Sequence, residues 1–380
     1  MTGEGLRAGR GRLTRRNTYL AVVLAAVGAM IVALGVWITR DGQQGTASGT
    51  GDRGLADNAV AGSMPRGVCA ASELLEPPCG AWWGAYVPYA ANGSLTDAVL
   101  AFEKRIGRRL DLVYNYHDMS NTGRDGVLLT SDEQELGRDR MLMLAWETTV
   151  WTEPHHENWT GTQLGWREVA SGKYDRDIID PGARRLKAYG KRLFFSFDQE
   201  ADFRTPDAGE PEEFVAAYRH VHDRFAKLGV DNVVWVWTVS GYAGNADLMK
   251  ALYPGDAYVD WIGVDQYNYF RCQRSARWLD FGSSQRPAYD WMREHISDEK
   301  PLMLSEFSTA PDPDRPDRQR DWYREIPKTA PTLPGVKALV HWNRPVPGKN
   351  CDLTVNKGPA LDGYRYAGED AYFNQPLPSR

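Results

Sequence analysis

The stretch LFFSFDQE, residues 193–200, decides the fold when it is read together with VVWVWTVS, residues 233–240. Each is a short run of apolar and aromatic residues, as expected of a parallel strand that is covered on both faces. Between them, apolar residues recur at steps of three and four after Pro211, which predicts an amphipathic helix that stops at Gly229. These residues are Phe214, Tyr218, Val221, Phe225 and Leu228. The whole stretch therefore predicts one unit of strand, helix and strand.

Six further runs of the same kind follow one another along the chain. They are WWGAYVP (82–88), DLVYNYH (111–117), LMLAWE (142–147), IGVDQYN (262–268), LMLSEF (302–307) and KALVHWN (337–343). Their spacing of roughly 30 to 50 residues suits repeated βα units. Eight such units predict an α/β fold, a (β/α)8 TIM barrel, for which ~250 residues are typical. An open doubly wound sheet is the alternative, but Gly80, Gly84 and Gly93 lack the spacing of a phosphate-binding turn.

The composition is that of a folded globular protein. Of the 380 residues, 42% are apolar and 25% are charged, which is unlike a disordered chain. The net charge of -5 provides no positive field for nucleic acid, so we expect no nucleic-acid partner. The chain has 14 Trp, 18 Tyr and 11 Phe, more flat aromatic surface than a core requires. We expect some of these rings to face a neutral ligand, and we expect no cofactor.

The N-terminal part predicts a membrane anchor. Residues 1–18 contain five arginines, and residues 19–39 contain no charged residue. A helix of ~20 apolar residues spans the bilayer, so we expect a signal anchor with a cytoplasmic N-terminus and an extracellular C-terminal domain. A cleaved signal peptide is the alternative. Residues 40–67, rich in Gly, Ser, Thr, Ala and Asp, are expected to form a flexible linker before the barrel domain, residues 68–380.

The four cysteines are even in number and lie in a segment expected to be extracellular, where disulfides persist. We predict that Cys69 pairs with Cys79 and that Cys272 pairs with Cys351, and two other connectivities remain open. A zinc site is less favoured, because no Cys-x-x-Cys spacing occurs.

Two glutamates close predicted strands, Glu200 in FFSFDQEADF and Glu306 in LMLSEFSTA. Active groups of a barrel gather where the strands end. Strict alternation places Glu306 in the same row as Leu302 and Leu304, and Glu200 in the row of Phe194, and we expect both rows to face the barrel interior. Two carboxyls suit acetal cleavage, in which one protonates the leaving oxygen and the other attacks the anomeric carbon, ~5–5.5 Å apart in retaining enzymes. We therefore predict Glu200 and Glu306 as a catalytic pair.

The region from about residue 82 to 373 resembles glycoside hydrolase family 26, the β-mannanase family of the large retaining (β/α)8 clan. The resemblance rests on VVWVWTVSG, YPGDAYVDWIGVDQYNYF, KPLMLSEFSTAP, PGVKALVHWN, CDL and EDAYF. It implies that Glu200 is the acid/base and Glu306 the nucleophile. It also implies that Tyr267 steadies the nucleophile and that Trp342 is a platform for a sugar ring.

This chain departs from the family pattern at two positions. Gln199 stands where a His usually precedes the acid, and Ser308 stands where a Gly is common. An amide donates to a sugar hydroxyl but carries no proton, so recognition at that position is expected to differ. The resemblance implies an extracellular retaining hydrolase of β-linked polysaccharide, with β-1,4-mannan as the first expectation and xylan or mixed-linkage glucan as others. The alternative is a glycan-binding envelope protein without activity.

Further residues near strand ends are candidates for contact with a glycan. Trp146 and Trp237 offer flat faces for sugar rings, and His117 is a candidate hydrogen-bonding group. A metal-dependent hydrolase built on His117 and on the pair 155–156 is the weaker interpretation, because adjacent histidines rarely reach one ion. We therefore predict no metal.

Overall fold

The computed structural model describes residues 71–89, 93–152, 160–272, 277–346 and 351–378. The predicted cytoplasmic segment, signal anchor and linker lie outside these ranges. Within them, no helix combines the length and the apolar character that a membrane span requires.

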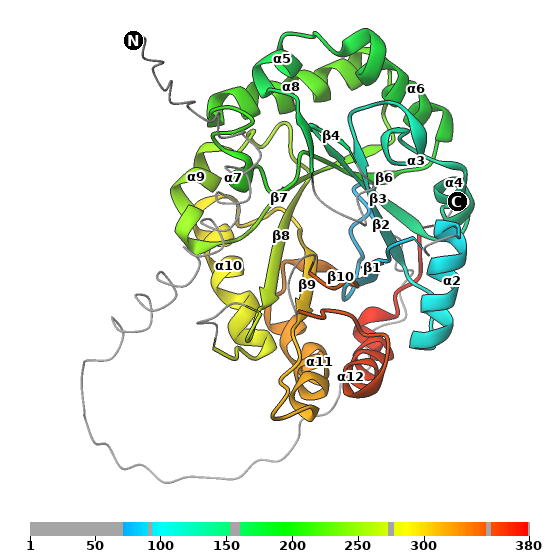
Figure 1. Cartoon of the computed structure of the whole chain (residues 1–380), viewed down its shortest axis with the longest axis vertical. Helices are drawn as coiled ribbons and strands as arrows, with labels where there is room; N and C mark the ends of the chain where they lie inside the picture. Colours follow the sequence, from blue (N-terminus) through cyan, green and yellow to red (C-terminus); the bar gives the residue numbers. More distant parts are fainter. Residues whose placement is uncertain (1–70, 90–92, 153–159, 273–276, 347–350, 379–380) are drawn as a thin grey trace, which may run out of the picture. The chain divides into compact units, whose positions relative to one another are not determined.

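Eight parallel strands close into a barrel in chain order, so that the first strand pairs with both the second and the last (Figure 1). The barrel confirms all eight predicted strands and excludes the open doubly wound sheet. The strands are β1 (Trp82–Tyr86), β2 (Leu112–Asp118), β3 (Met141–Glu147), β6 (Leu193–Phe197), β7 (Val233–Val239), β8 (Trp261–Asn268), β9 (Leu302–Thr309) and β10 (Val336–Trp342). A separate antiparallel hairpin, β4 (Thr149–Trp151) and β5 (Gly161–Gln163), follows β3.

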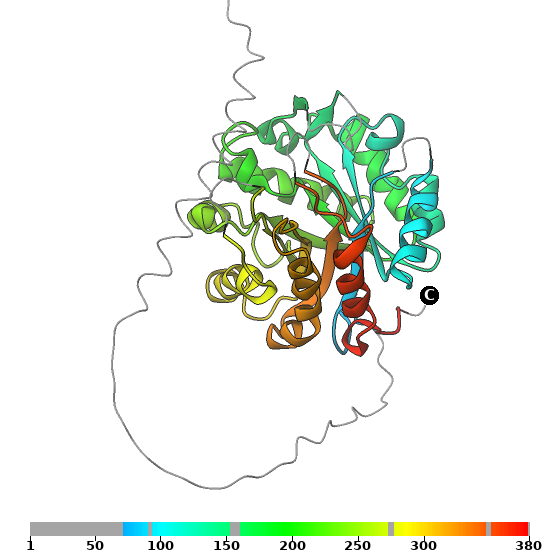
Figure 2. The same cartoon turned by 60° about the horizontal axis from the view of Figure 1, so that its bottom comes forward.

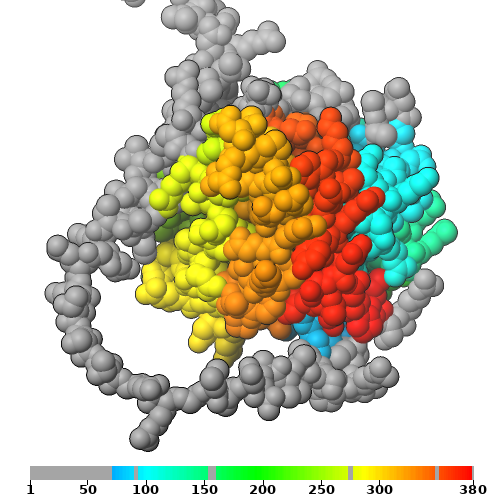
Figure 3. All heavy atoms as spheres, turned by 90° about the horizontal axis from the view of Figure 1, so that it is seen from below, coloured from blue at the N-terminus to red at the C-terminus, as the bar shows by residue number. Residues whose placement is uncertain are grey.

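Helices surround the barrel (Figure 1). They include α2 (Leu95–Ile106), α3 (Gly123–Gly126), α4 (Ser131–Leu136), α5 (Trp166–Ala170), α6 (Asp180–Tyr189), α7 (Ala201–Arg204), α8 (Pro211–Lys227), α9 (Ala246–Ala251), α10 (Phe281–His295), α11 (Asp317–Thr329) and α12 (Gly358–Gly368). The predicted helix between the fourth and fifth strands is α8, which begins at Pro211 and is followed by Gly229 at φ 71°. Three of the outer helices, α10 to α12, pack side by side (Figure 2) and present a continuous surface of side chains (Figure 3).

The alternation of side chains along each strand divides the core into two layers. One layer fills the barrel interior and includes Tyr114 and Tyr116 of β2. The other layer lies between the strands and the helices and includes Val113 of the same strand. A residue reaches the mouth of the barrel only when it belongs to the interior row.

The strand β9 breaks this alternation close to its end. Leu302 and Leu304 pack against the helices, so the prediction that they share a face with Glu306 is wrong. The register between β8 and β9 shifts after Leu304, and the next paired residue is Glu306. Ser305 and Glu306 therefore both reach the barrel interior, where Ser305 Oγ donates to Asp265 Oδ1 (2.6 Å). A β-bulge of this kind turns a side chain that strict alternation would direct to the other face.

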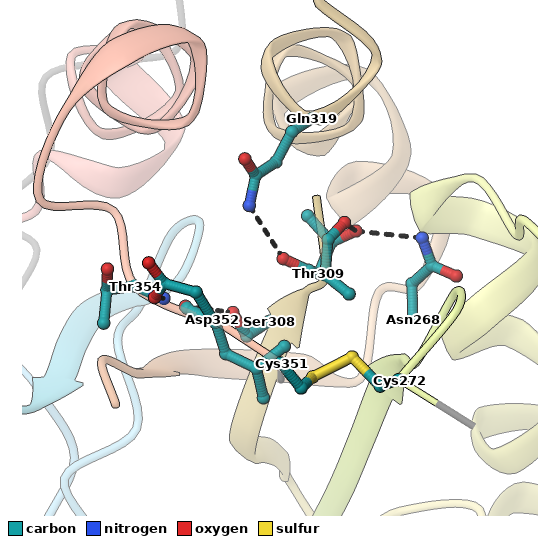
Figure 4. Close-up of a disulfide and its surroundings, with 10 residues drawn as sticks. Asn268, Cys272, Ser308, Thr309, Gln319, Cys351, Asp352 and Thr354 are labelled. Carbon is teal, nitrogen blue, oxygen red and sulfur yellow. Dashed lines mark hydrogen bonds between the residues drawn. A yellow bond between two sulfur atoms is a disulfide. The ribbon is translucent and has the colours of Figure 1, made fainter. Parts of the chain in front are cut away.

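The disulfide between Cys272 and Cys351 is present, as predicted, with its Cα atoms 5.1 Å apart. It joins the loop that follows β8 to the segment that follows β10 (Figure 4). Close to it, Asn268 Nδ2 donates to Thr309 Oγ1 (2.9 Å), which ties the ends of β8 and β9. Cys69 lies outside the described residues, so its pairing with Cys79 stays a prediction.

Ser308, one of the two departures from the family pattern, lies in the core and not in the site. Its side chain is fully buried, and its Oγ donates to the carbonyl oxygen of Leu353 (2.7 Å). It also lies 3.2 Å from both the hydroxyl of Tyr323 and Nε2 of His341. The hydroxyl therefore anchors the segment after β10 to the barrel wall.

Candidate active site

Glu306 lies in the barrel interior between two tyrosines. The hydroxyl of Tyr116, from β2, donates to one carboxylate oxygen of Glu306, and the hydroxyl of Tyr267, from β8, donates to the other. Both tyrosines belong to the interior rows of their strands. The structure therefore brings Tyr267 to Glu306, as the family resemblance implied, and adds Tyr116 as a second donor.

Glu200 is positioned by an irregular backbone at the end of β6. Asp198 and Glu200 both adopt left-handed conformations, with φ of 47° and 53°. Such conformations are uncommon for residues other than glycine and are often found at functional sites. The amide of Glu200 donates to the carbonyl oxygen of Thr238 on β7 (3.0 Å), and Glu200 is the N-cap residue of α7.

The two glutamates share one electrostatic environment. Burial raises the pKa of Glu200 well above its usual range, and the charge of Glu306 raises this pKa further. Burial also raises the pKa of Glu306, to about 7, although the hydrogen bonds from Tyr116 and Tyr267 oppose this increase. Glu306 therefore loses its proton at a lower pH than Glu200. A nucleophile must be ionised and an acid protonated, and this order of ionisation provides both at once.

A third carboxylate, Glu147, lies at the end of β3 and was not identified from the sequence. It is buried and accepts hydrogen bonds from Gln199 Nε2 (2.5 Å) and Trp151 Nε1 (2.9 Å). Arg204, from α7, approaches Glu147 to 3.1 Å and Asp198 to 3.3 Å. This cluster fixes Gln199, whose Oε1 is buried and has no hydrogen-bond partner in the described part of the chain. Gln199 therefore retains one free acceptor beside Glu200.

Asp265 is a further acidic residue that the sequence interpretation missed. It pairs with Glu306 in the register of β8 and β9 and is buried. Burial raises its pKa well above the usual range, and the charges of Glu306 and Glu200 raise it further. The negative charge of Glu306 thus favours the protonated form of Asp265. The sequence did contain a signal for it, because Asp265 precedes Tyr267 by two residues and therefore lies on the same face of the strand.

Trp342 reaches the site through the interior row of β10. Only 5% of its surface is exposed, its ring stacks on Tyr86 (centroids 6.0 Å apart), and it meets Tyr267 edge to face at 6.1 Å. The aromatic wall formed by Trp342 and Tyr86 therefore adjoins the tyrosine that holds Glu306.

The structure does not bring Trp146, Trp237 and His117 to the site. All three are fully buried and belong to the rows that face the helices. Trp146 packs against Phe195, and Trp237 packs against Tyr253. Each of the three directly follows an interior residue of its strand, so its side chain lies on the other face of that strand. Trp146 and Trp237 therefore belong to the core.

His117 bonds to the helical layer and not to the barrel mouth. Its Nε2 lies 2.7 Å from Glu133 Oε1, and its Nδ1 lies 3.0 Å from the carbonyl oxygen of Asp125. Residues 155 and 156 lie outside the described ranges. Within those ranges, no group of three or more His, Cys, Asp and Glu side chains has a geometry that could hold a metal ion.

The closed barrel with two glutamates at its mouth is the architecture of a (β/α)8 glycoside hydrolase. The family model described as glycosyl hydrolase family 26 matches residues 202–280. Endoglucanase H of Acetivibrio thermocellus is 28% identical over 282 residues, which are 71% of this chain and 29% of that protein. Beta-1,3-xylanase TXYA of Vibrio sp is 32% identical over 145 residues, 37% of this chain and 28% of that protein. The chain is thus similar to glycoside hydrolase family 26, and it spans less than a third of the length of these curated relatives.

Solved structures support the fold. A β-mannanase from a symbiotic protist of the termite Reticulitermes speratus, complexed with gluco-manno-oligosaccharide, has a TM-score of 0.54 and 18% identity, covering 78% of this chain and 90% of its own. A mannanase of Bacillus subtilis also has a TM-score of 0.54, with 15% identity, covering 78% of this chain and 86% of its own.

Removal of the Tyr267 hydroxyl is expected to change the pH profile of activity. A donor stabilises the ionised form of Glu306, so Tyr267→Phe should raise the pKa of Glu306 and move the acidic limb of kcat/KM to higher pH. Loss of a hydrogen bond to a charged group should lower kcat/KM on the acidic side by about 10- to 100-fold. Tyr253→Phe is the control, because that hydroxyl donates to Asp256 and not to Glu306. Superimposable acidic limbs would contradict the role of Tyr267.

Proposed function

We propose that the protein is a retaining glycosidase in which Glu200 is the acid/base and Glu306 is the nucleophile. The observation that carries the proposal is the arrangement around Glu306: two phenol hydroxyls donate to its carboxylate, while Glu200, in the same buried site, keeps a higher pKa. Similarity to the glycoside hydrolases of family 26 supports the same class of reaction.

In this mechanism, Glu306 attacks the anomeric carbon while Glu200 gives its proton to the departing glycosidic oxygen. The covalent bond formed by Glu306 removes its negative charge, which lowers the pKa of Glu200. The Glu200 carboxylate then accepts a proton from water, and the water oxygen displaces Glu306. Two displacements at one carbon return the original anomeric configuration. Tyr267 and Tyr116 hold the attacking carboxylate in one orientation throughout.

The proposed substrate is a β-linked polysaccharide, with β-1,4-mannan as the first to be tested. Trp342 and Tyr86 provide an aromatic wall for an apolar sugar face, and Gln199 Oε1 provides an acceptor for a sugar hydroxyl beside Glu200. The named activities of the curated relatives add β-glucan and β-1,3-xylan to the panel. We propose the same site for all three polymers.

We also propose that the catalytic domain lies outside the cytoplasm and is attached to the membrane. The uncharged run 19–39 after five arginines supports this location. The disulfide between Cys272 and Cys351 is consistent with an oxidising compartment.

Azide rescue tests the assignment of Glu200. On the best polymer of the panel, Glu200→Ala should lower turnover by about 10²- to 10⁴-fold, because general acid and base assistance is lost. Azide needs no base, so it should restore part of the second step and yield a glycosyl azide with the substrate's own anomeric configuration. Proton NMR of the product identifies the anomer. Binding of the polymers by the wild-type protein without new reducing ends would favour the glycan-binding alternative.

A further inference from the structure

A cavity lies at the end of the barrel opposite the active site. Its volume is about 560 Å³, within the range of small-ligand sites. It opens where β2, β3 and β6 begin, whereas Glu200 and Glu306 lie where strands end. The basic residues in its lining are Arg109, Arg138, Arg140, Lys191 and Arg192, and the acidic ones are Glu73 and Asp139.

One of these arginines is already neutralised inside the protein. Arg140 donates to both carboxylate oxygens of Glu103, at 2.7 and 2.6 Å, and also to Asp139 (2.6 Å). Arg109 competes for the same Asp139 at 3.2 Å. Asp139 is thus shared between two guanidinium groups and cannot neutralise the rest of the cavity.

The other cations lack a close carboxylate partner in the described part of the chain. No hydrogen bond or ion pair is formed by the exposed side chain of Arg138 there. Arg192 approaches Glu73 only to 3.7 Å, and that glutamate side chain is 91% exposed. Lys191 donates to the carbonyl oxygen of Gly137 (2.8 Å), which satisfies a hydrogen bond but leaves its charge uncompensated.

The cavity therefore has the opposite sign to the protein as a whole. The chain carries a net charge of -5, yet these cations converge on one concave surface. Like charges brought together repel one another unless an anion lies between them, and a concave surface strengthens their common field. An anion with several oxygens relieves this repulsion and offers acceptors to more than one guanidinium group.

The floor of the cavity is partly apolar. Leu75 and Met141, both buried, line it together with Tyr189 and Leu377. Lys191 Nζ lies 5.9 Å from the centre of the Tyr189 ring. A ligand that fills this space thus has a charged group at the basic rim and an uncharged body on the aromatic and aliphatic floor.

We propose that this cavity binds a phosphate-bearing ligand, with its phosphate between Arg138 and Arg192 and its body against Tyr189 and Met141. Phosphate has the charge and the number of acceptor oxygens that this convergence of donors requires. The phosphate can belong to a soluble sugar phosphate or to a lipid head group, since Ala71, the first described residue after the predicted linker, also lines the cavity.

Binding measurements on the full-length protein test the site. The probes are inorganic phosphate, glucose 6-phosphate, and vesicles of phosphatidylglycerol compared with vesicles of phosphatidylcholine. The double variant Arg138→Gln, Arg192→Gln should weaken binding of the preferred probe at least tenfold, and added salt should weaken binding to the wild type. Arg176→Gln is the control for loss of an arginine outside the cavity. It removes one positive charge, against two in the double variant, from an exposed arginine in the segment that leads into α6, whereas the cavity lies at the end of α6.

The outcomes distinguish a soluble sugar phosphate from a lipid head group as the source of the phosphate. Preference for glucose 6-phosphate over inorganic phosphate indicates a soluble ligand, and preference for phosphatidylglycerol vesicles indicates a lipid head group. Equal binding by the double variant and the control, or no binding of any probe by the wild type, would overturn the proposal. Hydrolysis of polysaccharide by the double variant is expected to equal that of the wild type, so this test is independent of the catalytic assignment.

Discussion

Glu306→Gln is expected to lower kcat on the best polymer by about 10³-fold or more, a loss of ~4 kcal/mol in transition-state stabilisation. An amide has the shape of the carboxylate but does not form the covalent bond to the anomeric carbon. The hydroxyl groups of Tyr116 and Tyr267 can still donate to the amide oxygen or rotate toward other acceptors. The fold should therefore be retained, which thermal unfolding followed by circular dichroism verifies.

The control for this variant is Glu294→Gln on α10, where the glutamate side chain is 77% exposed. Reducing ends released per minute from mannan, β-glucan and β-1,3-xylan provide the readout. The loss should be the same on every polymer that the wild type cleaves, because Glu306 acts at the anomeric carbon and not in the choice of sugar. A Glu306→Gln protein with more than a tenth of the wild-type kcat would show that another group is the nucleophile.

The barrel was predictable because its signals are local. Each strand is an apolar run, and α8 shows its apolar period, its initial Pro211 and its terminal Gly229 within one segment. The end of β9 was not predictable in the same way. The bulge that turns Glu306 into the barrel depends on the register against β8, which involves two strands distant in sequence. Glu306 was identified for its place at the end of an apolar strand, and it faces the barrel interior as expected, although Leu302 and Leu304 do not share its face.

The side of the strand on which each candidate residue lies explains the remaining successes and failures. Tyr267 and Trp342 belong to interior rows, whereas Trp146 and Trp237 belong to rows that face the helices. A strand covered on both faces is apolar on both, so composition alone does not tell the two rows apart. Glu147 was missed for a related reason: its partners come from the β4–β5 hairpin and α7, which only the folded chain brings together.

The second large effect is expected for stability. Glu133→Ala should lower the free energy of unfolding by about 3–5 kcal/mol, because it leaves His117 buried without the carboxylate that faces it. Both side chains are completely buried and lie 2.7 Å apart. Glu133 also accepts hydrogen bonds from Asn115 Nδ2 (2.6 Å) and the amide of Thr130 (2.6 Å). The variant therefore leaves a donor on β2 and a donor at the start of α4 without their acceptor. Chemical denaturation measures the change, and Glu135→Ala, an exposed glutamate on the same helix, is the control.

The dependence of this effect on pH distinguishes a charged pair from a neutral hydrogen bond. Burial disfavours the charged form of both side chains, but the opposite charge of the partner and the hydrogen bonds outweigh burial. The pKa of Glu133 therefore lies below 4.5, and the pKa of His117 lies above 6.5. The contribution of Glu133 is complete above pH 4.5 and is lost as the pH falls through its lowered pKa. The contribution of His117 is complete below pH 6.5 and is lost as the pH rises through its raised pKa. The difference between wild type and Glu133→Ala should therefore be largest between pH 4.5 and 6.5 and decline on both sides. A difference that does not vary with pH would mean that the two side chains are held together without ionisation.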